Sequence, residues 1–295
     1  FPRTALFHEF VERPNGNWDI KPIERTSNLW YLVNDQKKAS CNGLAADNID
    51  KSYIFDAFIS KHLSPFHMTA PVKILMPGKK VDGEWKVISD TDRALMNAST
   101  AYVFNQIVED VNTPTSLSAY LHDFINIYGK LDKQKFSTKN WLVLSSASGA
   151  NPCAAYISLE TIDRSRLIID QTLYWYLADS EDEAIYIVGL LNSNALSEAI
   201  KDFQPEGGFG KRHIHTLPYK IIPKYNNEDA NHIDVISRTR ELMQEWAAMC
   251  YEAEYANLLQ PNSSSLSSRR RRQQVAIRKL DAYAEYEAAC YAVLY

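Results

Sequence analysis

A strand, two helices and a returning strand are indicated in order along the middle of the chain. Residues 167–177 are rich in Ile, Tyr and Trp, which is typical of a buried strand. Ser180 and Glu183 have the spacing of a capping box, so a helix is expected to begin there. Asn194 is placed to cap a second, short helix that ends near Phe203. A glycine-rich loop follows, and the next segment, from 213 to 222, has the pattern of a strand.

The first 160 residues alternate between short strand patterns and helical ones. A helix is expected where Asp50 precedes apolar positions that continue to His62, and a longer one where apolar residues recur at helical spacing from 91 to 111. A further helix is predicted over 116–127. Strands are predicted over 4–11, 18–20, 70–76, 84–88, 141–145 and 154–159.

Two heptad-like stripes occupy the C-terminal part of the chain. The first is Val235, Thr239, Leu242, Trp246, Met249, Ala253 and Ala256; the second is Ile277, Leu280, Ala284, Ala288, Tyr291 and Leu294. A serine-rich connector separates them, so an antiparallel helical hairpin is predicted. Such a hairpin either packs back on the preceding domain or forms a separate dimerising or spacing coiled coil, and the first arrangement is the more common.

These patterns together predict an α+β protein. Residues 1–225 are expected to form a mixed-sheet domain with helices packed on it, and residues 226–295 the C-terminal helical hairpin. The length of 295 residues and the hydrophobic content of 45% are sufficient for a sizeable core. The chain starts at Phe1 within a strand pattern, so we expect it to be part of a longer protein.

Charge and cysteine content narrow the possible functions. The formal net charge of −4 argues against general coating of a nucleic acid, so any such contact would use a local basic patch. The four cysteines have no zinc-like spacing, and a reduced state in the cytoplasm is expected. No apolar run is long enough for a membrane span, and no metal site is predicted.

A basic, glycine-rich loop is the first candidate site. It comprises Gly207, Gly208 and Gly210, followed by Lys211 and Arg212. Pro205 and Arg212 stand where a P-loop needs Gly and Ser or Thr, and a dinucleotide fingerprint needs its glycines between a strand and a helix. One interpretation is that the glycines let the backbone approach an anion closely, beside the two cations Lys211 and Arg212. The other is that the segment is an ordinary helix C-terminus with basic residues in and after its last turn.

Three other groups of residues carry possible chemistry. Arg269, Arg270, Arg271 and Arg272 form a basic run at the start of a helix, where the dipole disfavours cations, so a polyanion would compensate; a solvated helix end is the alternative. His213 and His215 share a strand face without a third metal ligand. Four aromatic residues could stack on an extruded base: Trp141, Tyr174, Trp175 and Tyr176. Aromatic residues in strands more often belong to the core.

The central segment resembles the C-terminal target-recognition region of N6-adenine DNA methyltransferases of restriction-modification systems, including fused methylase-endonucleases. The resemblance is carried by residues 182–186, 190–193 and 208–218, with the Ile222-Pro223 and Asn231-His232 pairs after them. It implies recognition of double-stranded DNA. The expected DNA-binding residues are Gly207, Gly208, Gly210, Lys211, Arg212, His213, His215, Lys220, Arg269, Arg270, Arg271 and Arg272.

Catalytic motifs of that family are missing from this chain. An adenine methyltransferase needs a glycine-rich turn for the methyl donor and an Asn-Pro-Pro-Tyr type motif for the flipped adenine, whereas here only Asn151-Pro152-Cys153-Ala154 occurs. No catalytic residue and no cofactor are therefore predicted; S-adenosylmethionine is expected only for the parent enzyme. The expected partner is an upstream methyltransferase domain, in the same polypeptide or as a separate subunit. The alternative is a specificity subunit whose hairpin docks a methyltransferase or translocase.

Overall fold

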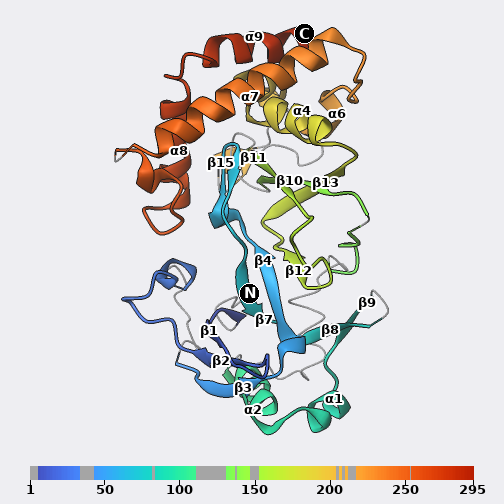
Figure 1. The fold of residues 1–295 in the computed structure, drawn as a ribbon, viewed down its shortest axis with the longest axis vertical. Coiled ribbons are helices and arrows are strands. Elements are labelled where there is room, and N and C mark those ends of the chain that lie inside the picture. The colour runs from blue at the N-terminus through green and yellow to red at the C-terminus, as the bar shows by residue number, and fades with distance from the viewer. Residues whose placement is uncertain are drawn as a thin grey trace. The chain divides into compact units, whose positions relative to one another are not determined.

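The computed structural model describes residues 6–33, 43–81, 84–110, 131–136, 138–146, 153–203, 206–207, 210–211, 217–252 and 254–295. They form two compact units (Figure 1). The first comprises residues 1–57, 71–135 and 163–168, and the second comprises 58–70, 136–162 and 169–295. The predicted α+β class is confirmed, with several small sheets and helices packed around them. In the described part of the chain, no helix is both long and apolar enough to cross a membrane.

Small sheets and two helices build the first unit. One sheet has the order β1-β2-β3 and another β12-β4-β7, while β8 and β9 form a hairpin. Their buried side chains, with those of α2, form one core that includes Ile20, Ile49, Leu75 and Phe104. The bounds are β1 Glu9–Glu12, β2 Trp18–Lys21, β3 Ala46–Ile49, β4 Ile54–Phe58, β7 Val72–Leu75, β8 Gly78–Val81, β9 Glu84–Val87, β12 Leu167–Ile169, α1 Asp90–Leu95 and α2 Ala98–Asp110, with short 3-10 turns at Trp30–Leu32 and Lys51–Tyr53.

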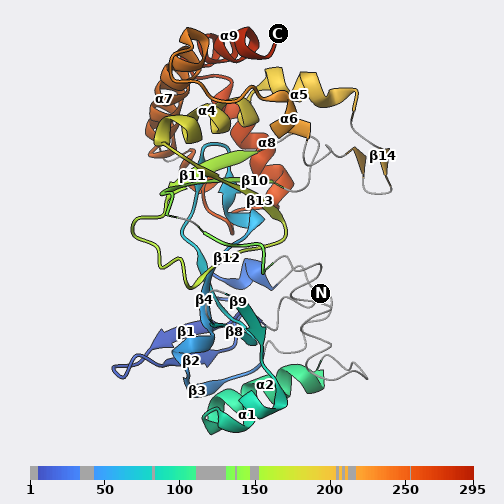
Figure 2. The same ribbon diagram turned by 90° about the vertical axis from the view of Figure 1, so that its right-hand side faces the viewer.

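The second unit has a three-stranded sheet covered by helices. The sheet has the order β11-β10-β13, and both pairs of strands are antiparallel. Helix α4 packs on this sheet, α7 packs on α4, and α9 packs on α7 and α5 (Figure 2). The bounds are β5 Leu63–Ser64, β6 His67–Met68, β10 Trp141–Ser146, β11 Ala154–Ser158, β13 Leu173–Ala178, α4 Glu181–Asn192, α5 Asn194–Lys201, β14 Glu206–Gly207, β15 Gly210–Lys211, α6 Leu217–Ile221, α7 Ala230–Cys250, α8 Leu266–Ile277 and α9 Tyr283–Leu294, with 3-10 turns at Ser60–His62 and Ala256–Leu258.

Helix α4 begins where the sequence predicts. The Ser180 hydroxyl accepts the backbone N–H of Glu183 at 3.1 Å, so the N-cap is confirmed. The Glu183 carboxylate accepts the N–H of Asp179 instead of that of Ser180, and it also accepts the Tyr176 hydroxyl at 2.8 Å. Every residue from Glu183 to Leu191 is buried. A helix buried on all sides needs partners on both faces, and here they are the sheet and the C-terminal helices.

The predicted helix from Asp50 to His62 is wrong. Asp50 caps only the turn Lys51–Tyr53, through the N–H of Ser52 at 2.8 Å, and the chain then forms strand β4. Four of its five residues are buried, whereas a surface helix would bury one stripe. The aromatic and β-branched side chains of this segment suit a strand packed on both faces.

Several other predicted elements are divided or shifted. The helix predicted over 91–111 is divided into α1 and α2, because Asn97 accepts the N–H of Thr100 and starts a new helix. The strand over 167–177 becomes β12 and β13, separated by a turn in which Asp170 accepts the N–H of Thr172. Ser193 caps α5 in place of Asn194. Within the segment predicted as a strand over 213–222, residues 217–221 form α6, since Pro218 is tolerated in the first turn of a helix.

The helical hairpin is confirmed, although its second arm consists of α8 and α9. The first stripe follows α7, where Val235, Thr239, Leu242 and Trp246 are buried. These side chains share one core with α4, α5 and the sheet, so the hairpin packs back on the rest of its unit. The predicted helix over 116–127 and the stripe position Ala253 lie outside the described residues.

Helices α4 and α7 approach each other closely at Gly189. A Cβ atom on Gly189 would lie 2.3 Å from Oγ1 of Thr239, which is itself fully buried. We expect Gly189→Ala to lower the free energy of unfolding by about 1–3 kcal/mol because of this overlap. Helix propensity alone would change it by about 1 kcal/mol in the opposite direction. Urea unfolding followed by circular dichroism measures the difference.

The matched control is the double variant Gly189→Ala/Thr239→Ala. Removing the Thr239 hydroxyl leaves room for the new methyl group, so the double variant should be closer to Thr239→Ala in stability than additivity predicts. A Gly189→Ala protein as stable as the wild type would show that the two helices are farther apart.

Candidate nucleic-acid interface

The glycine-rich loop forms a short hairpin where it is described. Strands β14 and β15 pair antiparallel, with Gly207 opposite Gly210 and Glu206 opposite Lys211. The placements of Gly208, Arg212, His213 and His215 lie outside the described residues, as do the side chains of Glu206 and Lys211. The described part of the loop is therefore limited to these two pairs of residues. Its role in DNA binding stays a prediction.

Lys220 is exposed on the short helix α6, and Lys224 is exposed just after it. Both lysines are thus near the loop in sequence and accessible to an anion. No ion pair joins either lysine to another residue in the described part of the chain.

The arginine run is divided between the interior and the surface. Arg269 is only 1% exposed; its guanidinium donates to the backbone carbonyls of Lys61 and Gln260. Arg270 is half-buried and donates to the carbonyls of Ser60 at 3.1 Å and Leu63 at 3.4 Å. Arg269 is therefore a packing residue, and the prediction that it contacts the DNA backbone does not fit its position.

Carbonyl oxygens explain how α8 tolerates cations at its N-terminus. The dipole of a helix disfavours positive charge there, but the guanidinium groups of Arg269 and Arg270 extend away from the helix to the partly negative carbonyls of residues 60–63. Gln273 adds a donor on the same side, to the Ser64 hydroxyl at 2.7 Å and to the Leu258 carbonyl at 2.6 Å. These bonds fix which face of α8 points inward.

The opposite face of α8 is basic and exposed. At 100° per residue, Arg271, Arg272 and the C-cap residue Arg278 fall within an arc of about 120°. Lys279 follows in the turn after α8, and all four residues are exposed. No Asp or Glu occurs between Leu266 and Leu280. Arg272 donates to the Ser264 hydroxyl at 2.8 Å, a bond that leaves its charge uncompensated. We call these four residues the basic face.

Arg278 and Lys279 were not among the residues predicted from sequence. They lie seven residues after Arg271 and Arg272, which is about two helical turns, so each pair shares a face. This spacing, with the absence of carboxylates through the segment, is the signal that could have identified them.

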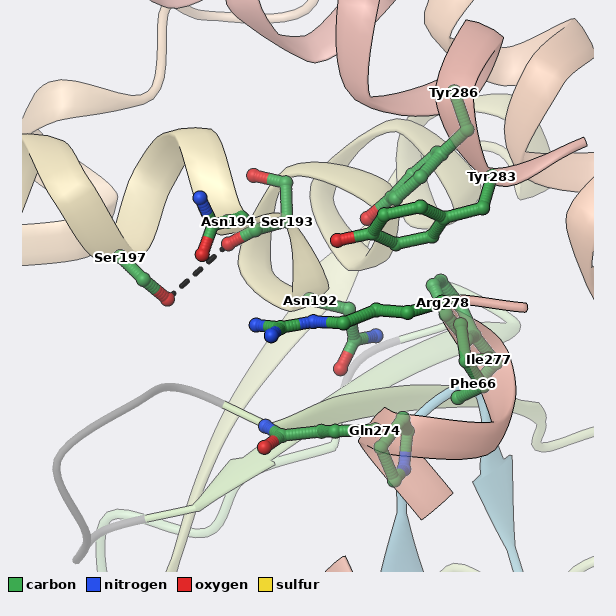
Figure 3. A pocket seen from close by; sticks show the side chains of 11 residues that line it. Phe66, Asn192, Ser193, Asn194, Ser197, Gln274, Ile277, Arg278, Tyr283 and Tyr286 are labelled. Atoms are coloured by element: carbon green, nitrogen blue, oxygen red, sulfur yellow. Dashed lines mark hydrogen bonds between the residues drawn. The ribbon is translucent and has the colours of Figure 1, made fainter. Parts of the chain in front are cut away.

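A small polar cavity lies beside Arg278 (Figure 3). Its volume is about 30 Å³, roughly that of one water molecule in the liquid. Arg278 and Gln274 extend into it from α8, opposite Asn194 and Ser197 of α5 (Figure 3). With a volume of about 30 Å³, this cavity is too small for a ligand.

The amides at the start of α5, beside this cavity, already have an anionic partner. The buried Glu287 carboxylate accepts the N–H groups of Asn194 at 2.7 Å and Ala195 at 3.2 Å, as well as the Tyr283 hydroxyl at 2.8 Å. This helix N-terminus therefore binds α9 and is not open to an external anion.

Titratable groups give no sign of a nucleophile or metal centre among the described residues. No group of His, Cys, Asp and Glu there could hold a metal ion. Cys153, Cys250 and Cys290 are free thiols, and burial raises the pKa of each, to about 11 for Cys250. A raised pKa reduces the thiolate fraction, so these cysteines are expected to be unreactive.

No protein-family model matches the sequence, and no curated protein matches it. A structure of the type IIL restriction-modification enzyme MmeI in complex with DNA aligns with 98% of this chain and 34% of its own, at 11% identity and a TM-score of 0.43. The type IIG restriction endonuclease BpuSI aligns with 99% of this chain and 31% of its own, at 13% identity and a TM-score of 0.36.

This chain thus spans about a third of the length of each solved structure.

Two arginines of one helix provide a test of the interior and surface assignments. We expect Arg269→Ala to lower the free energy of unfolding by about 2–5 kcal/mol, because it leaves two backbone carbonyls without their donor and removes a buried side chain. Arg271→Ala should change it by less than about 0.5 kcal/mol. Urea unfolding of both variants measures this, and equal losses would contradict the orientation of α8.

Proposed function

We propose that this chain is a DNA target-recognition module, the C-terminal part of an N6-adenine DNA methyltransferase of a restriction-modification system. The observation that carries the proposal is the basic face of α8. Arg271 and the C-cap residue Arg278 are seven residues apart, or about 10 Å along α8, and Lys279 follows in the next turn. About six phosphates of a duplex occur over that length, counting both strands. A helix and its C-terminal turn with four exposed cations and no carboxylate are therefore suited to a phosphate backbone.

The sequence resemblance supplies the finer part of the proposal. The motif residues of the target-recognition region continue from α4 into the loop at β14 and β15, and α4 carries the 182–186 segment. The proposal implies a methyltransferase domain upstream, in the same polypeptide or as a separate subunit. That domain would bind S-adenosylmethionine and would supply the catalytic residues. The whole protein would act in the cytoplasm.

Residues of the basic face would position the module, since phosphate contacts carry no sequence information. Base reading would then fall to other residues, and the loop with Lys211, Arg212 and Lys220 is the candidate that the resemblance indicates. Gly207, Gly208 and Gly210 would allow the backbone to approach the duplex closely.

Salt dependence of duplex binding tests the role of the basic face. Each cation that neutralises a phosphate contributes about 0.9 to the slope of log affinity against log salt concentration. Arg271→Gln/Arg272→Gln should therefore reduce the slope by up to about 1.8. Fluorescence anisotropy with a labelled mixed-sequence duplex, between about 50 and 200 mM salt, gives the slope.

Lys201→Gln/Arg240→Gln is the matched control, because both residues are exposed in the same unit and their replacement changes the net charge equally. It should alter the slope much less. The basic face would not be part of the interface if the arginine double variant had the same salt slope as the wild type. The same conclusion would follow if both double variants changed the slope equally. Lys211→Ala/Arg212→Ala in the same series tests the loop, with an expected reduction of up to about 1.8.

Absence of the methyl-donor motif from the sequence leads to a separate prediction. We expect this chain alone not to bind S-adenosylmethionine, since it has no glycine-rich turn between a strand and a helix. Isothermal titration calorimetry measures binding directly. Stoichiometric binding with a micromolar dissociation constant would contradict the assignment of the methyl-donor site to an upstream domain.

A further inference from the structure

An aromatic pocket lies in the second unit, apart from the basic face in sequence. Its volume is about 330 Å³, within the range of small-molecule sites. Strand β13, helix α4 and the segment from α6 to Tyr225 form its walls. Four aromatic residues, three aliphatic ones, one carboxylate and one cation line it: Trp175, Tyr176, Tyr219, Tyr225, Ile187, Ile222, Pro223, Glu183 and Lys224.

Hydrogen bonds fix the wall formed by β13 and α4. The Glu183 carboxylate accepts the Tyr176 hydroxyl at 2.8 Å with one oxygen and the Asp179 N–H at 2.5 Å with the other. The Tyr219 hydroxyl is 2.7 Å from Oγ of Ser145 on β10. The polar ends of these tyrosines are thus bonded within the protein, which leaves their rings to form the pocket surface.

Helices α4 and α7 anchor the opposite wall. His232 accepts the N–H of Asn226 at Nδ1, at 3.0 Å, so the proton of a neutral imidazole is on Nε2. Nε2 is then the donor to the Tyr186 hydroxyl at 3.2 Å, and that hydroxyl donates to the Pro223 carbonyl at 3.1 Å. Tyr225 stacks on His232 with ring centroids 6.3 Å apart. This chain of bonds holds the pocket in a formed state.

Chemistry of the lining selects the class of ligand. Aromatic rings favour a planar π system, because each stacked base gains affinity on an aromatic platform. A quaternary ammonium group also binds aromatic rings. Both oxygens of the Glu183 carboxylate already accept hydrogen bonds, however, and the exposed ammonium of Lys224 on the lining would repel such a cation. Lys224 would attract a phosphate attached to the planar ring. A base joined to a phosphate satisfies both requirements.

We propose that this pocket receives one unstacked nucleobase of a nucleotide, with the Lys224 ammonium beside its phosphate. The proposal deepens the proposed function where the base belongs to a bound DNA strand, and to that extent rests on it. The same chemistry also accommodates a free nucleotide. A base held outside the stack would add contacts that the basic face alone cannot make.

Photo-crosslinking identifies the residues that touch the base. The probes are 5-iododeoxyuridine monophosphate, a single strand and a duplex that each carry one 5-iododeoxyuridine. After irradiation of the whole chain, peptide mass spectrometry locates the linked residue. Crosslinks to Trp175, Tyr219 or Tyr225 are expected; crosslinks confined to other residues with all three probes would overturn the proposal.

Affinity of the single strand provides the second measurement. Tyr225→Ala should weaken binding by at least about fivefold through the loss of one stacking surface, whereas Tyr251→Ala, at a side chain 91% exposed on another part of the unit, should not. Lys224→Gln should weaken it more than Lys201→Gln does. Because Lys224 is exposed, this pair is informative even if Tyr225→Ala unfolds, and equal effects within the lysine pair would contradict a phosphate at Lys224.

These experiments distinguish a failure of the pocket proposal from a failure of the proposed function. Duplex binding that depends on the basic face, with no crosslink in the pocket, would refute the pocket alone. A crosslink with the mononucleotide, with no duplex binding, would instead support the pocket as a free-nucleotide site and refute the proposed function.

Discussion

Burial of helix α4 on every side is the constraint on which the second unit depends. A fully buried helix has no solvent face, so each of its residues needs a specific neighbour. Gly189 meets this need by having no side chain, which lets Thr239 of α7 approach, and its carbonyl accepts the Tyr286 hydroxyl of α9 at 2.6 Å. The C-terminal hairpin is therefore an integral part of the core around α4 and cannot be removed without exposing it (Figure 1).

Local signals in the sequence predicted the elements whose ends are capped by their own residues. Ser180 caps α4 as expected, and the stripe through Val235, Leu242 and Trp246 follows α7. The same reasoning failed at Ile54–Phe58, where nearly every side chain is buried and neither periodicity is visible. The same reasoning predicted one long helix over 91–111, whereas the N-cap at Asn97 starts a separate helix, α2.

The candidate site was predictable in composition but not in orientation. Four consecutive arginines point in all directions around a helix, and the sequence does not say which direction is inward. That choice is made by carbonyls of Lys61 and Ser60, about 200 residues earlier in the chain. Arg278 and Lys279 acquire a role only once this orientation is known, because it places them beside Arg271 and Arg272.

The orientation of the exposed arginines of α8 therefore depends on the interior arginine, Arg269. Arg269 and Gln273 hold the helix against residues 60–64 and 258, and the rotation that they impose turns Arg271, Arg272 and Lys279 outward. A conservative exchange of Arg269 to Lys would keep the charge but lose the fork of donors that reaches two carbonyls at once. The basic face would then lose its fixed orientation although none of its own residues had changed. The orientation of the basic face is for this reason a property of the whole unit, because Ala276 and Ile277 of α8 share one core with side chains of α4, α7 and α9.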